Sequence, residues 1–139
     1  MTGRWACPNC EREFARPRQA HVCVPAGTVD ETFGNHPPAW RAVYDAIAGH
    51  LAGLGPVHAD AVKVGVFLKS DRKLAEVRPR KRAVDLVLVM PHPVQHPRVS
   101  RTLRMTAEST AVFVPLTAPS EVDGQVCEWL TEAYDAATD

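Results

Sequence analysis

The spacing of apolar residues predicts two helices, one early in the main part of the chain and one at its C-terminal end. From residue 38 to about residue 54, apolar side chains recur every three or four positions, which is typical of a helix with one buried side. The same period runs from Val122 to Ala137, with Ser120 as the expected cap and Asp123 as its acidic partner. Glycine and proline after Leu54 are expected to end the first helix.

Between these helices the apolar period changes to two, which predicts strands. Five segments show it: 62–68, 74–78, 83–90, 99–105 and 110–116. Their connections are too short for parallel crossovers, so we expect antiparallel pairing. Segment 83–90 is apolar on both faces apart from Asp85, which places it inside the sheet. The predicted fold is α+β, in the order α-β-β-β-β-β-α, with both helices packed on one face of the sheet.

Length and composition fit one ordinary domain with a small appendage. The chain has 139 residues, of which 45% are hydrophobic. We expect a zinc-ribbon module at 1–25, a linker at 26–36 and an α+β domain at 37–139. No apolar run approaches the roughly 18 residues of a membrane span, and no apolar leader precedes the first cysteine, so we expect no membrane partner and a cytoplasmic location.

Four residues near the start have the types and spacing of a metal site: Cys7, Cys10, His21 and Cys23. Three thiolates and one imidazole form a closed tetrahedral set, so we expect one structural zinc ion as cofactor. His21 and Cys23 are only one residue apart, which indicates an extended ribbon and disfavours a finger whose last ligands lie on a helix. The alternatives are a redox-active Cys-x-x-Cys pair and a disulfide.

Charge is unevenly distributed along a chain whose net charge is zero. Residues 60–105 contain eleven lysines and arginines against four acids, whereas residues 106–139 contain seven acids and no lysine or arginine. The candidate binding residues are the cations of predicted turns and of one strand: Arg72, Lys73, Arg78, Arg80, Lys81, Arg82, Arg101 and Arg104. Such a group can bind nucleic acid or an acidic protein surface. The alternative is solvated turns balanced by the acidic C-terminal segment, within one molecule or across a dimer.

Other residues that could carry chemistry are isolated in the sequence. His92 and His96 lie in a proline-rich loop, and His58 with Asp60 precedes a predicted strand; we expect surface histidines here. Glu76 and Asp85 are carboxylates on predicted strands, and we expect Lys63 or an arginine of the basic turn to neutralise Asp85. The sequence has no P-loop, dinucleotide fingerprint or nucleophile elbow. We therefore assign no catalytic residue and no reaction.

Several short segments resemble a known family. They are residues 5–14 (WACPNCEREF), 19–23 (QAHVC), 54–57 (LGPV), 74–80 (LAEVRPR) and 129–134 (WLTEAY). These segments are similar to bacterial proteins that carry an N-terminal zinc segment and the domain of unknown function 5655. The resemblance extends over nearly the whole chain. It implies this architecture and a bacterial origin, but no activity and no catalytic residues.

Together these features predict a binding or adaptor module with a structural zinc, which binds nucleic acid through a basic hairpin at Arg78, Arg80, Lys81 and Arg82. The alternative is a protein-interaction or self-association module. Segments 62–68 and 83–90 are apolar on both faces, so helices on one side would leave the other side to be covered, for example in a sheet-to-sheet homodimer. A small enzyme is the third hypothesis.

Overall fold

The computed structural model describes residues 5–8, 13–14, 16, 18 and 27–139. In this part of the chain the helices are α1 (Val29–Phe33), α2 (Pro38–Ala52) and α3 (Gly124–Ala136), with a 3-10 helix at Pro119–Glu121. A short N-terminal hairpin is formed by β1 (Trp5–Ala6) and β2 (Glu13–Phe14). The main sheet consists of β3 (His58–Val62), β4 (Gly65–Lys69), β5 (Lys73–Pro79), β6 (Val84–Met90), β7 (Arg101–Thr106) and β8 (Ser109–Leu116).

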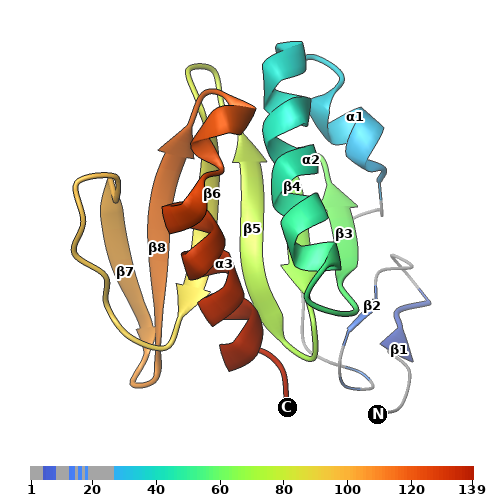
Figure 1. The fold of residues 1–139 in the computed structure, drawn as a ribbon. Helices are drawn as coiled ribbons and strands as arrows, with labels where there is room; N and C mark the ends of the chain where they lie inside the picture. The colour runs from blue at the N-terminus through green and yellow to red at the C-terminus, as the bar shows by residue number, and fades with distance from the viewer. Residues whose placement is uncertain (1–4, 9–12, 15, 17, 19–26) are drawn as a thin grey trace.

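The six strands of the main sheet are arranged in the order β3-β4-β5-β6-β8-β7, and every neighbouring pair is antiparallel. The predicted α+β class and antiparallel pairing are confirmed, and β6 lies inside the sheet as expected. Strand β8 lies between β6 and β7, so that β7 forms one edge of the sheet (Figure 1).

The predicted strand 62–68 is wrong in detail, because two strands meet there. Strand β3 ends at Val62, residues 63 and 64 make the turn, and β4 begins at Gly65, which pairs with Val62. A two-residue turn leaves the alternation of apolar residues unbroken, so the sequence pattern alone predicts one continuous strand. A side chain at Gly65 would bring its Cβ to 2.9 Å from the carbonyl oxygen of Val77, so this position requires glycine.

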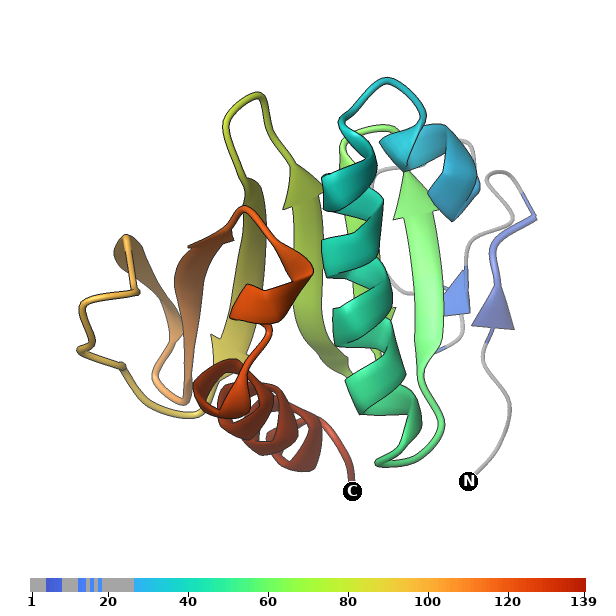
Figure 2. The same cartoon turned by 45° about the horizontal axis from the view of Figure 1, so that its top comes forward.

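Helices α2 and α3 lie side by side on one face of the sheet, as predicted (Figures 1 and 2). Ile47 and Leu51 of α2 and Leu130 of α3 are fully buried against strand residues such as Leu86 and Leu88. Each such side chain stabilises the fold by about 1.5–3 kcal/mol relative to an exposed one. No helix in the described part of the chain is long and apolar enough to cross a bilayer.

The last helix begins later than predicted. Ser120 belongs to the 3-10 helix, and Asp123 is the cap of α3, where its carboxylate accepts from the backbone N–H of Val126 at 3.2 Å. The guanidinium of Arg98 also donates to the carboxylate of Asp123. The pKa of Asp123 is lowered first by the hydrogen bond from the Val126 backbone and then by that from Arg98.

The segment expected to be a linker, 26–36, contains helix α1. Thr28 and Glu31 form a capping box at its start, and the hydroxyl of Thr32 donates to the carbonyl of Val62 at 2.7 Å. Phe33 is buried and lies against Tyr44, with ring centroids 5.4 Å apart. The packed part of the chain therefore includes α1.

Candidate binding face

The face of the sheet opposite α2 and α3 is the candidate site, and we call it the open face. Strand register and alternation place one row of side chains across it. From β3 to β7 this row is Asp60, Phe67, Glu76, Val87, Phe113 and Arg101. Val87, Phe113 and the adjacent Ala111 form an apolar cluster separate from the main core. The row therefore has an apolar centre between charged and aromatic neighbours.

Glu76 is the most buried charged group of the row. Its side chain is 4% exposed, one carboxylate oxygen accepts from Lys73 at 2.7 Å, and the other accepts from Arg78. Burial acts to raise the pKa of Glu76, but the hydrogen bonds from Arg78 and Lys73 outweigh it, so the pKa lies below its ordinary value. Glu76 is thus an ionised acceptor that fixes two half-exposed cations on the open face.

Two cations lie over aromatic rings of the same row. The ammonium of Lys73 is 4.5 Å from the centre of the Phe67 ring, and the guanidinium of Arg101 is 4.4 Å from that of Phe113. Each such contact contributes about 0.5–1 kcal/mol at an exposed site. They also hold positive charge directly above flat apolar surfaces.

The eight predicted cations do not form one patch, because they lie at both ends of β5 and on β7. Arg72 lies in the β4–β5 turn, where it pairs with Asp139 at 2.7 Å and donates to the carbonyl of Ala136. The C-terminal end of the chain therefore neutralises it. Arg101 and Arg104 of β7 pair with Phe113 and Thr110, which places them on opposite faces of the sheet.

The basic β5–β6 turn contains Arg80, Lys81 and Arg82, all of which are exposed. Helix α2 supports this turn, because the indole N–H of Trp40 donates to the carbonyl of Arg80 at 2.7 Å. The guanidinium of Arg80 is 3.4 Å from Asp85, which confirms the expectation that an arginine of the turn neutralises this carboxylate. Within the described part of the chain, Lys81 and Arg82 form no ion pair.

The N-terminal hairpin contacts the sheet at β3 and β4. The ammonium of Lys69 lies 4.6 Å from the centre of the Phe14 ring, and it donates to the carbonyl of Glu13 at 3.2 Å and to Asp60 at 3.3 Å. His58 lies 3.7 Å from the carboxylate of Glu13. The hairpin therefore covers the β3–β4 end of the open face.

Of the four predicted zinc ligands, Cys7 lies among the described residues. It is 3% exposed and packs with Phe14 and Trp5, whose strands pair with each other. Cys10, His21 and Cys23 lie outside the described residues. In the described part of the chain no three histidine, cysteine or carboxylate side chains form a group that could hold a metal.

The histidines of the proline-rich loop contact α3. His92 pairs with Glu132, and His96 meets the Trp129 ring edge-on at a centroid distance of 5.1 Å. The carbonyl of Pro93 and then Glu132 raise the pKa of His92. These contacts attach the loop to α3.

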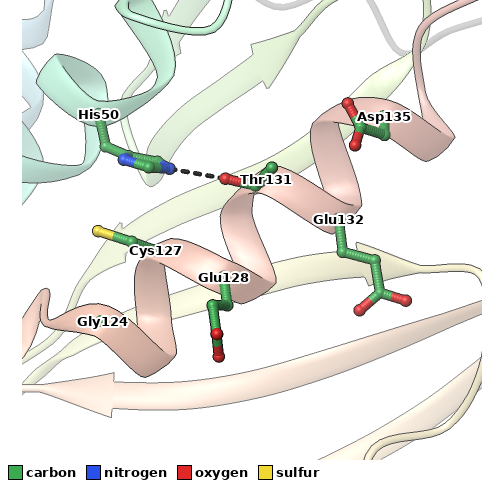
Figure 3. A pocket seen from close by; sticks show the side chains of 7 residues that line it. All are labelled: His50, Gly124, Cys127, Glu128, Thr131, Glu132 and Asp135. Carbon is green, nitrogen blue, oxygen red and sulfur yellow. Dashed lines mark hydrogen bonds between the residues drawn. The ribbon is translucent and has the colours of Figure 1, made fainter.

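A shallow depression lies between α2 and α3 on the covered face of the sheet (Figure 3). It is lined by His50, Gly124, Cys127, Glu128, Thr131, Glu132 and Asp135. A ring nitrogen of His50 is hydrogen-bonded to the Thr131 hydroxyl at 2.9 Å, as the dashed line in Figure 3 shows. Burial, and secondarily Asp123, raise the pKa of the Cys127 thiol, so it is a poor nucleophile at neutral pH. We assign no reaction to this depression.

The sequence identified the cations and carboxylates of the open face but not the row that joins them. Phe67, Val87 and Phe113 belong to different predicted strands, and their alignment depends on strand order and register. The alternation of side chains along each strand could have assigned each residue to one face of the sheet. The clearest sign of the open face in the sequence is Phe67, an aromatic residue close to charged positions. It could not have placed Arg101 over Phe113.

Comparison with known proteins gives a family but no activity. No curated protein and no solved structure matches the chain significantly. The model of one family, described as a domain of unknown function (DUF5655), matches residues 29–137, a span that begins with α1 and contains the six-stranded sheet and α3. The chain therefore belongs to the DUF5655 family.

Proposed function

We propose that the chain is a binding module whose open face takes an anionic partner, and that single-stranded nucleic acid fits this face best. The observation that supports the proposal is the composition of the face. Outside the end that the hairpin covers, its charged residues are the cations Lys73, Arg78, Arg80 and Arg101 and the carboxylates Glu76 and Asp85. Four cations against two carboxylates leave an excess of two positive charges beside the rings of Phe67 and Phe113.

Single-stranded nucleic acid matches this arrangement because it combines negative phosphates with flat bases. Bases stack on aromatic rings and on guanidinium planes, and lysine and arginine neutralise the backbone. Arg101 presents a guanidinium plane above Phe113 and can serve both purposes. The acids of α3, namely Glu128, Glu132 and Asp135, line the depression on the other side of the sheet and would not repel such a chain.

We also propose that Cys7, Cys10, His21 and Cys23 bind one structural zinc. The burial of Cys7 beside Phe14 and Trp5 supports this, because a thiol in so small a cluster needs a staple to stay packed. The ion would hold the hairpin whose Glu13 and Phe14 contact Lys69. Its role would be to fix one end of the binding face.

Fluorescence anisotropy with labelled oligonucleotides of about 20 nucleotides tests the nucleic-acid proposal. We expect a dissociation constant of about 1–100 µM at physiological salt, typical of binding that does not depend on sequence. The double variant Arg80→Gln and Arg101→Gln, which removes two cations of this face, should bind more weakly. For single strands the slope of log affinity against log salt should fall by roughly 0.7 for each phosphate that the variant no longer neutralises.

Arg41→Gln is the matched control, because Arg41 lies on α2 and is paired there with Asp30 and Asp45. It should bind like the wild type. Unchanged affinity and salt slope in the double variant would refute the proposal. If polyglutamate competes as well as an unlabelled oligonucleotide, the face binds acidic protein surfaces and the choice of nucleic acid is wrong.

Metal analysis of protein purified without added zinc tests the zinc proposal. We expect one equivalent in the wild type and a loss of metal in Cys10→Ser, with Cys127→Ser as the control that keeps it. Less than about half an equivalent in the wild type, unchanged by Cys10→Ser, would exclude a four-ligand structural site.

A further inference from the structure

Arg101 differs from the other cations of the open face in that no carboxylate among the described residues pairs with it. It is exposed at the start of β7, and within the part of the chain that the structure describes it forms neither an ion pair nor a side-chain hydrogen bond. Its guanidinium is 4.4 Å from the centre of the Phe113 ring, which is itself buried. The ring therefore positions the guanidinium, while its N–H donors stay open to a ligand.

Carboxylates engage the remaining cations of the face. Lys73 and Arg78 both donate to Glu76, and the guanidinium of Arg80 lies 3.4 Å from a carboxylate of β6. Of the two excess positive charges, one therefore belongs to the group around Glu76, and the other is Arg101 alone. An anion that binds Arg101 competes with no carboxylate of the described residues, so its attraction to the face should be strongest there.

An exposed apolar surface adjoins Arg101 on the same face of the sheet. Leu103 follows two positions along β7, pairs with Ala111 and is 53% exposed. Ala111 belongs to the apolar cluster of Val87 and Phe113. Two residues along a strand span about 6–7 Å, a distance that one nucleotide bridges between its phosphate and its base. This end of the face thus offers hydrogen-bond donors and an apolar surface at the spacing of a single nucleotide.

We propose that Arg101 and Leu103 form the anchoring subsite of the open face and hold one nucleotide, with the backbone phosphate on the guanidinium and the attached base against Leu103. This inference rests on the proposed nucleic-acid function. A planar guanidinium can donate two parallel hydrogen bonds to one phosphate, which fixes its position as well as its charge. The N-terminal hairpin contacts β3 and β4 at the other edge of the sheet, so it leaves this subsite uncovered (Figure 1).

Arg104 provides an internal comparison, because it lies on the same strand but on the opposite face of the sheet. It pairs with Thr110, whereas Arg101 pairs with Phe113. Arg104 is also exposed, and among the described residues it has no carboxylate partner and no aromatic ring beneath its guanidinium. Net charge alone would make the two arginines equivalent, whereas the proposed subsite requires Arg101 only.

Fluorescence anisotropy with a labelled oligothymidylate of about 20 nucleotides tests the subsite. Arg101→Gln should lower the affinity by about tenfold and the slope of log affinity against log salt by roughly 0.7, the value for one phosphate of a single strand. Arg104→Gln is the matched control and should bind like the wild type. Arg80→Gln should lose less than about twofold, because a carboxylate of β6 already neutralises this arginine.

Two further variants separate the charge of the subsite from its shape. Arg101→Lys keeps the positive charge but not the planar guanidinium, so it should keep the salt slope and lose about threefold in affinity. Leu103→Ala removes apolar contact with the base, so it should also lose about threefold without a change of slope. Circular dichroism confirms that each variant is folded.

The outcomes distinguish the subsite from the function on which it rests. If the wild type does not bind the oligothymidylate, both the proposed function and the subsite are wrong. If it binds, but Arg101→Gln leaves the affinity unchanged or Arg104→Gln weakens it equally, the subsite alone is overturned. Wild-type affinity in both Arg101→Lys and Leu103→Ala would also overturn the subsite, because positive charge alone would then account for binding.

Discussion

Lys69 and Glu13 join the N-terminal hairpin to the sheet: the ammonium group on β4 donates to the backbone carbonyl on β2 at 3.2 Å. The same ammonium pairs with Asp60 on β3, and the two side chains are only 9% and 5% exposed. A buried charge pair of this kind is costly to break, because the remaining charge keeps its desolvation cost. The contact between hairpin and sheet therefore depends on Lys69.

Replacing Lys69 with methionine should lower the free energy of unfolding by about 3 kcal/mol, because it keeps the aliphatic stem and removes the charge opposite Asp60. Urea denaturation measures the change. Adding Asp60→Asn to Lys69→Met should restore part of the loss, since the buried charge is then gone as well. Lys63→Met, at an exposed position of the adjacent turn, should change stability by less than about 0.5 kcal/mol. A loss below about 1 kcal/mol in Lys69→Met would contradict the structural role.

Glu76 should make stability depend on pH in the acidic range. Because its folded pKa is lowered, its contribution is present above the unfolded value of about 4.3 and is lost as pH falls through the folded pKa. At pH 7, Glu76→Gln should therefore lower the free energy of unfolding by about 2 kcal/mol, because Lys73 and Arg78 lose a charged acceptor.

Urea unfolding at about pH 7 and about pH 3 measures this difference. The difference in the free energy of unfolding between wild type and Glu76→Gln should be smaller at the lower pH, because the wild-type carboxyl is then increasingly protonated. Glu108→Gln, at an exposed position between β7 and β8, is the control and should show no such gap. If the stability difference between wild type and Glu76→Gln stays constant with pH, the shape of the side chain rather than its charge is responsible.

His92 should titrate above the ordinary histidine value of about 6.5, because the Pro93 carbonyl and then Glu132 raise its pKa. The sign follows: its contribution to stability is full below the unfolded pKa and is lost as pH rises through the folded pKa. NMR titration of the imidazole measures the midpoint. Glu132→Gln should lower it, whereas Glu128→Gln, one turn away on α3, should lower it less. An unchanged midpoint in Glu132→Gln would exclude the ion pair in solution.

The sequence predicted the two layers of this fold, helices on one face of an antiparallel sheet. These layers follow from the spacing of apolar residues within each helix and strand, which neighbouring residues in the chain determine. It did not predict the break at residues 63 and 64, where a tight turn continues the alternation of the strands. It also chose Ser120 over Asp123 as the cap of α3; both residue types cap helices, and packing decides between them.

For the candidate site, the sequence identified single residues but not their partners. Asp85 was expected to pair with an arginine of the basic turn or with Lys63, and Arg80 lies 3.4 Å away. The grouping of the cations was not predictable in the same way. Arg72 and Arg78 are close in sequence but lie at opposite ends of β5, so one is neutralised by Asp139 and the other by Glu76. Such distances depend on register and on the position of the C-terminus.

Gly55 and Tyr134 provide a test of packing between the end of α2 and α3. A Cβ at Gly55 would lie 2.3 Å from the Tyr134 hydroxyl, which donates to the carbonyl of Pro56, and the backbone there has a φ of +155°. Gly55→Ala should therefore lower the free energy of unfolding by about 2 kcal/mol or more. Adding Tyr134→Phe should recover part of this loss, because the clashing oxygen is removed.

Gly49→Ala, inside α2 with no atom within 4 Å of the new Cβ, is the matched control and should raise stability by about 0.5–1 kcal/mol. Thermal and urea unfolding of the four proteins measure these changes, and equal effects at Gly55 and Gly49 would show that the close approach to Tyr134 is absent in solution.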